Sequence, residues 1–296
     1  MIIGHGVRVS FLGGLCVVLI GVLVHAAVAA ETKAAPSPFE TPEEAKSAYL
    51  SPASSSAVSN AALDHLNRLM TAKDQSLDTF RAACGALSLI YSKTRANDKL
   101  IRVYNRQLDV EKDPAVLWNV SASLAKAYLS LKEPQSARKT LEACLEKHRN
   151  EVSASLVAQA VTSLVAIYND NLSKPAEALA VLERELEALP ADAGAERAQL
   201  IKLKGDMHLA QKDPVKAEAE YNKVLGMEDA SSATLQGQVY LKLMQLYADT
   251  GRTDEAVKTL MACLKTDTLA TPKDPIQSFL DLKPSAEQID KLTELL

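Results

Sequence analysis

The chain has 296 residues, of which 47% are hydrophobic, 24% are charged and only 4% are aromatic. Its 33 Lys and Arg against 37 Asp and Glu give a formal net charge of −4 at pH 7, which argues against nucleic-acid binding, because such binding needs a strong basic excess. The length is ample for a sizeable core or for several stacked repeats.

Residues 1–30 have the pattern of a secretory signal peptide. Arg8 is their only formal charge, an apolar stretch covers residues 11–24, and small residues at 26–30 fit a signal-peptidase site. The alternative is an uncleaved anchor, because residues 11–30 are uncharged and just long enough to span a bilayer. In either case we expect an exported protein in the periplasm or elsewhere in the cell envelope.

Residues 31–60 are rich in Ala, Ser and Pro, a composition that predicts a flexible tether. Within this segment, Thr41 stands before Pro42 and three positions before Glu44, which is the order of a helix-capping box. The sequence therefore predicts one short helix inside the tether, ending near Leu50.

From about residue 61 onward the apolar residues follow a helical period, and no stretch alternates convincingly as a strand. A Tyr or His recurs at intervals of 39 or 40 residues, and an Ala follows it nine or ten positions later. The four pairs are Tyr128 and Ala137, Tyr168 and Ala178, His208 and Ala217, and Tyr247 and Ala256. Turn sequences with Pro or Gly separate the members of each pair. A fixed period of this length indicates an array of repeats.

The pattern resembles the tetratricopeptide repeat (TPR), a helix-turn-helix unit of 34 residues. The last unit carries the family's spaced residues as Tyr240, Leu243, Tyr247, Ala256, Leu260 and Cys263. A weaker first unit has Tyr91 at the aromatic position, and the third unit has one extra residue in its turn. The resemblance implies an all-α fold, an α-solenoid of about five TPR-like repeats over residues 61–270 with N- and C-terminal capping helices.

Small residues are expected where the two helices of a repeat approach each other. Gly205 and Ala125 should therefore face Ala217 and Ala137, and Lys204 departs from the family by replacing a Leu. Beyond residue 30 the three cysteines are Cys84, Cys144 and Cys263. We expect them to be small buried packing residues, and a redox or dimer role is the alternative, since their number is odd.

Residues 271–296 break the repeat pattern. Thr271-Pro-Lys-Asp-Pro275 ends the last helix, and Ser285 with Gln288 forms a capping-box start for a final Leu-rich helix. This helix is expected to cap the exposed core face of the array. The alternative is that it docks on another protein or on a second copy of the chain.

The sequence contains no motif for catalysis, for a cofactor or for a metal ion. It lacks the zincin, nucleophile-elbow, phosphate-loop and C-x-x-C patterns, and we find no nucleophile beside an evident base. His208 takes the place of the repeat Tyr and is expected to pack in the core. We therefore predict a protein that is not an enzyme.

The candidate partner-binding residues follow from the family resemblance, in which set positions of each first helix face bound peptide. The second position carries four primary amides, which can both donate to and accept from a peptide backbone: Asn119, Gln159, Gln199 and Gln238. Other facing positions carry Lys126, Lys202, Asp206 and Gln245. The alternative is that these residues form a polar face with no partner.

These observations together predict a non-enzymatic protein–protein interaction scaffold in a bacterial cell envelope, with an extended peptide or protein partner in its concave groove. Membrane contact would come only through an uncleaved N-terminal segment. The alternative is a structural or assembly protein that self-associates through the solenoid ends and the C-terminal helix.

Overall fold

The structure is a computed structural model that describes residues 37–227 and 232–265, together with residues 286 and 289. These residues form helices and connecting turns without any strand, so the fold is the predicted all-α solenoid. None of the described helices has the length and apolarity needed to cross a bilayer. The predicted signal segment and nearly all of residues 271–296 lie outside the described residues.

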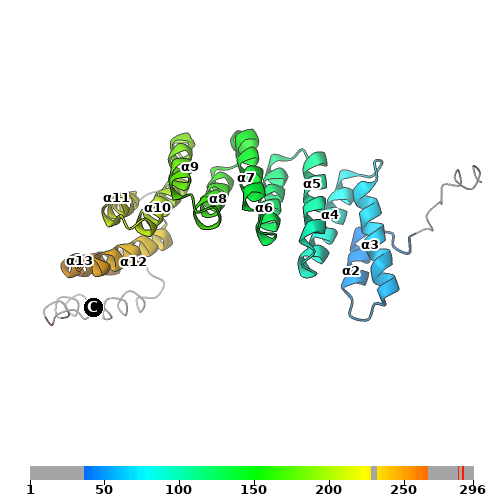
Figure 1. Cartoon of the computed structure of the whole chain (residues 1–296), viewed down its shortest axis with the longest axis horizontal. Helices are drawn as coiled ribbons and strands as arrows, with labels where there is room; N and C mark the ends of the chain where they lie inside the picture. Colours follow the sequence, from blue (N-terminus) through cyan, green and yellow to red (C-terminus); the bar gives the residue numbers. More distant parts are fainter. Residues whose placement is uncertain (1–36, 228–231, 266–285, 287–288, 290–296) are drawn as a thin grey trace, which may run out of the picture. The chain divides into compact units, whose positions relative to one another are not determined.

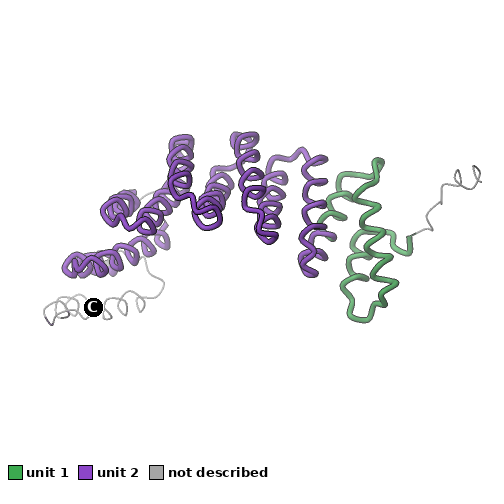
Figure 2. Tube along the Cα trace, viewed as in Figure 1, with its two compact units in different colours: residues 1–86 green, residues 87–296 purple. Residues whose placement is uncertain are grey.

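The chain divides into two compact units, residues 1–86 and residues 87–296 (Figure 2). In the first unit, helix α2 (Pro42–Leu50) packs against helix α3 (Ser56–Thr71). Helix α4 (Leu77–Lys93) continues from the first unit into the second.

The short helix predicted within residues 31–60 forms as α2, and it is packed against its neighbour. The capping box forms as expected, since the Glu44 amide donates to Thr41 Oγ1 at 3.2 Å. Ala45 is fully buried, and the Phe39 ring meets His65 edge-on with centroids 6.0 Å apart. Because these contacts hold α2 against α3, this segment belongs to a packed helical hairpin.

The second unit is a series of helix pairs, each packed on the next (Figure 1). In chain order they are α5 (Asn97–Val110), α6 (Pro114–Ser130), α7 (Pro134–His148), α8 (Ala154–Ala166), α9 (Pro175–Ala188), α10 (Gly194–Ala210), α11 (Pro214–Leu225), α12 (Ala233–Asp249) and α13 (Thr253–Lys265). Helices α6, α8, α10 and α12 are the first helices of their pairs. Helix α10 contacts α8 as well as α9, as expected where neighbouring repeats stack.

The turns inside the pairs share one backbone geometry. The residue four positions after the repeat Tyr or His has a positive φ: Arg95, Lys132, Lys212 and Gly251. The amide of the next residue donates to the carbonyl of the aromatic residue, as Glu133 does to Tyr128 at 2.9 Å. This is the hydrogen bond of a Schellman helix ending, and it fixes where the second helix starts.

The third repeat accommodates its extra residue at the end of its first helix. There the helix widens into a π-helical segment, Ile167–Asn171, called η2. The left-handed residue moves to Ser173, and the Lys174 amide donates to the Tyr168 carbonyl at 2.8 Å. The same turn thus forms one residue later.

The core follows the predicted Ala positions, with one difference at Gly205. Ala137 and Ala217 are fully buried, as are the corresponding Ala178 and Ala256. A Cβ at Gly205 would lie 2.6 Å from the Tyr221 ring, so glycine here makes room for Tyr221 rather than for the predicted Ala217.

Two further sequence expectations concern single side chains. Lys204, at the family's Leu position, reaches Glu183 at 2.9 Å and Glu220 at 3.4 Å, so ion pairs replace an apolar contact. The three cysteines are buried, as predicted.

Candidate functional site

The four predicted amides lie on successive first helices. Asn119 is on α6, Gln159 on α8, Gln199 on α10 and Gln238 on α12, and all four are exposed. Gln159 Nε2 lies 3.5 Å from Ser155 Oγ within its own helix. None of the amides lines the two cavities that lie beside α6. Their part in partner binding therefore stays a prediction.

Helix α6 has a cavity on each side. The α5–α6 cavity, of about 540 Å³, is lined by Ser92, Arg95, Asn97, Leu100, Tyr104, Ser123, Lys126, Ala127 and Ser130. The α6–α8 cavity, of about 450 Å³, is lined by Ala122, Ser123, Ala125, Lys126, Leu129, Leu141, Ser163, Ala166, Ile167 and Asn171. Ser123 and Lys126 line both, so the two cavities adjoin along one face of α6.

Lys126 is the predicted site residue that lies in this surface. It is exposed, and it forms no ion pair with any residue that the structure describes. The reason is local, because residues three and four positions away on α6 are Ala, Ser and Leu rather than carboxylates. Its ammonium group therefore remains available to an external anion.

Lys202 and Asp206 on α10 are placed differently, because they bind each other. Lys202 Nζ lies 2.9 Å from Asp206 Oδ2, and the Tyr221 hydroxyl donates to Asp206 Oδ1 at 2.7 Å. Burial and this hydrogen bond raise the pKa of Tyr221. On α12, Gln245 Nε2 similarly donates to Asp249 Oδ1 at 2.7 Å. These three predicted residues have partners inside the fold.

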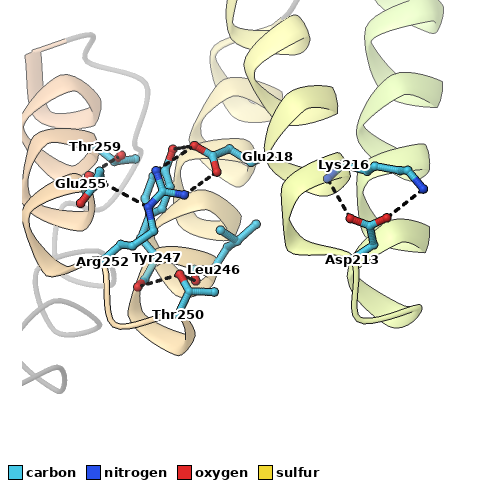
Figure 3. Close-up of polar contacts among 9 residues, drawn as sticks. All are labelled: Asp213, Lys216, Glu218, Leu246, Tyr247, Thr250, Arg252, Glu255 and Thr259. Carbon is cyan, nitrogen blue, oxygen red and sulfur yellow. Dashed lines mark hydrogen bonds and ion pairs between the residues drawn. The ribbon is translucent and has the colours of Figure 1, made fainter.

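A cluster that the sequence did not reveal joins the fourth repeat to the fifth (Figure 3). The Tyr247 hydroxyl donates to Glu218 Oε1 at 2.8 Å, and Arg252 Nη1 donates to Glu218 Oε2 at 2.6 Å. Arg252 also lies over the Tyr247 ring, 4.6 Å from its centroid. Arg252 lowers the pKa of Glu218, while burial and Glu218 raise the pKa of Tyr247 to about 12.

A similar cluster joins the second repeat to the third. The Tyr168 hydroxyl donates to Glu142 Oε1 at 2.5 Å, and Arg138 binds the same carboxylate and lies over the ring. Tyr168 and Tyr247 therefore each place their hydroxyl on a carboxylate of the preceding repeat. The two Glu residues do not occupy one repeat position, so spacing alone could not identify them. Their role is to hold adjacent repeats together.

His208 stands where Tyr168 and Tyr247 stand in the neighbouring repeats. It is 7% exposed, as its predicted packing role requires, and its Nδ1 has no hydrogen-bond partner among the described residues. Burial, followed by the nearby Lys204 charge, lowers the pKa of His208. The described residues also contain no group of three or more His, Cys, Asp or Glu side chains that could hold a metal ion.

Tetratricopeptide repeat family models match residues 83–116, 123–150 and 237–268. Three segments of the chain thus match tetratricopeptide repeats. The matched segments cover the first, second and fifth of the expected units, including the weak one around Tyr91. The fourth unit has the turn geometry of the matched ones, and the third forms the same turn one residue later. A search of curated proteins found no significant sequence match.

One solved structure with a TM-score above 0.5 has the same fold. BtubC (BKLC) from P. vanneervenii matches with a TM-score of 0.51 and 16% identity, over 77% of this chain and 91% of that one. A Rap protein complexed with Competence and Sporulation Factor matches with a TM-score of 0.47 and 17% identity, over 78% of this chain and 68% of that one. The TPR protein TTC0263 from Thermus thermophilus matches with a TM-score of 0.37 and 22% identity, over 70% of this chain and 96% of that one.

Proposed function

We propose that this TPR protein is a non-enzymatic scaffold that binds an extended peptide segment of a partner protein along the first helices of its repeats. The observation that carries the proposal is the pair of adjoining cavities beside α6, which contain the uncommitted Lys126. Repeat arrays of this kind build extended binding surfaces, because each unit adds one first helix to the same face.

The exposed amides would extend this surface along the later repeats. Gln159, Gln199 and Gln238 belong to successive first helices, and each can donate to and accept from a peptide backbone. We place the protein in a bacterial cell envelope on the strength of the signal-like residues 1–30. N-terminal sequencing of the mature chain tests the export step and separates cleavage from anchoring.

Site-specific photo-crosslinking tests the binding surface. A photoreactive residue replaces Ser163, which lines the α6–α8 cavity, in the full chain expressed in its native cells. The matched control replaces Lys139, an exposed residue of α7 that lines neither cavity beside α6. We expect a discrete protein adduct from position 163 and none from position 139. Identical adduct patterns from both positions would contradict the proposal.

A further inference from the structure

The α5–α6 cavity is cationic. Its charged lining residues are Arg95 and Lys126, and it has no carboxylate in its wall. Neither side chain forms an ion pair with any of the described residues, so neither positive charge is neutralised within the described part of the chain. Both are exposed, which lets an incoming anion reach them without displacing an internal partner.

Neutral hydrogen-bond donors surround these two cations. The wall contributes the Asn97 amide and the hydroxyls of Ser92 and Tyr104, none of which is hydrogen-bonded to another described residue. Ser123 and Ser130 donate to carbonyls of their own helix, at 2.9 and 3.0 Å. A ligand with several acceptor oxygens and a negative charge would satisfy this set, and a carboxylate has both.

The α6–α8 cavity has a different chemistry. Apolar groups make up most of its wall, with Leu129, Leu141 and Ile167 as the large side chains and Ala at 122, 125 and 166. Lys126 is its only charged lining residue. An aliphatic side chain placed here would leave water for an apolar surface, which is the general driving force for such pockets.

The two cavities adjoin, since they share Ser123 and Lys126. In an extended peptide, side chains on one face are two residues apart, at a rise of about 3.3 Å per residue. Such a peptide can therefore place one side chain in each cavity. On the proposed function, we infer that the partner segment carries an acidic residue two positions from an aliphatic one, with the acid in the α5–α6 cavity and the aliphatic side chain in the α6–α8 cavity.

Peptide display on the immobilised full chain tests this inference. The probe is a library of random 12-residue peptides, selected in parallel on the natural chain and on three variants. Arg95→Gln with Lys126→Gln removes the two cavity cations. Ala166→Leu fills part of the apolar cavity from an exposed helical position. Lys132→Gln with Lys139→Gln is the control, because it changes the net charge equally at exposed sites outside both cavities.

The natural chain and the control pair should enrich peptides with Asp or Glu two positions from Leu, Ile, Val or Met. The Arg95 and Lys126 pair should lose the acidic preference alone, and Ala166→Leu should weaken the aliphatic preference alone. For the best peptide, we expect the double Gln variant to raise the Kd about 2- to 30-fold, and the natural chain to bind it less tightly as salt increases. Unchanged thermal midpoints would show that the variants fold.

Two results would overturn the inference, and they differ in whether the proposed scaffold function is also refuted. Enriched peptides without the acidic preference, or with a preference that survives loss of both cations, would refute the paired-subsite assignment while the scaffold function stands. No enrichment over a blank surface would refute the scaffold function as well.

Discussion

The second and fourth repeats each carry a charged residue two positions before the repeat Tyr or His. The two residues nevertheless have different roles. Lys126 on α6 is exposed, has no ion-pair partner among the described residues and lines two cavities. Asp206 on α10 binds Lys202 and accepts a hydrogen bond from Tyr221. Repeat position thus places a residue on the first helix, while its neighbours decide whether it stays available for a partner.

The largest expected effect concerns the close packing behind Asp206. Gly205→Ala would place a Cβ 2.6 Å from the Tyr221 ring, which is fully buried and tied to Asp206. We expect a loss of about 1–3 kcal/mol in the free energy of unfolding, measured in urea. On α6 the same repeat position is occupied by Ala125, so the second repeat tolerates the Cβ that the fourth repeat excludes.

Gly85→Ala is the matched control for this substitution. Gly85 is an exposed helical residue of α4, and a Cβ there would meet nothing within 4 Å. Because glycine is unfavourable inside a helix, this change should stabilise the chain by about 0.5–1 kcal/mol. Equal effects at both positions would show that the packing around Gly205 is not as tight as described.

The second prediction tests whether Asp206 is a structural residue. Asp206→Ala leaves the buried Tyr221 hydroxyl without its acceptor, so we expect a loss of about 1–3 kcal/mol in the free energy of unfolding. The same substitution made in a Tyr221→Phe chain should cost clearly less, because the hydroxyl is already gone. If Asp206→Ala lowered the free energy of unfolding equally in the natural chain and in the Tyr221→Phe chain, the two side chains would not be coupled.

The third prediction concerns pH and the His208 that replaces a repeat Tyr. Its pKa in the fold is lowered from 6.5, so the unfolded chain binds the proton more tightly than the folded chain. The contribution of His208 to the free energy of unfolding is therefore constant above pH 6.5. It becomes destabilising as the pH falls below 6.5. The charged groups that act on it are Lys204, Glu220, Asp213 and Lys216, and it acts in turn on Glu183.

His208→Tyr should reduce the fall in urea midpoint between pH 7 and pH 5. Part of the fall should remain, because burial also lowers the pKa of His65 in the first unit. A pH dependence identical to that of the natural chain would mean that His208 does not titrate differently in the fold.

The smallest expected effect on stability is at the exposed amides. Changing Gln159, Gln199 and Gln238 to Ala should leave the thermal midpoint nearly unchanged, since exposed substitutions of this kind usually cost less than about 0.5 kcal/mol. The same triple variant should capture the crosslinked partner less well. If the triple variant captured the partner as well as the natural chain does, the amides would not belong to the binding surface.

The sequence predicted the helix pairs because the spacing from Tyr247 to Ala256 and its equivalents reflects the contact between paired helices. The sequence also marks Gly251 as a residue suited to a left-handed turn, since glycine favours that conformation. It could not predict the same conformation at Lys132 or Lys212, whose residue type does not favour a positive φ.

The candidate site was less predictable for a related reason. Asp206 is engaged by Tyr221, a residue of the next helix, and no repeat position marks that pair. The cavities beside α6 are likewise formed by several helices together, so no local pattern identifies them. The sequence likewise predicted the short helix of residues 42–50 but could not show that its Ala45 is buried.

The most direct test of the central claim measures affinity and stability together for Lys126→Ala and Asp206→Ala, with the best displayed peptide as ligand. We predict that Lys126→Ala weakens binding without changing the urea midpoint. Asp206→Ala should lower the urea midpoint while the folded chain binds the peptide as before. The opposite assignment, with binding lost at Asp206 and stability lost at Lys126, would contradict the account.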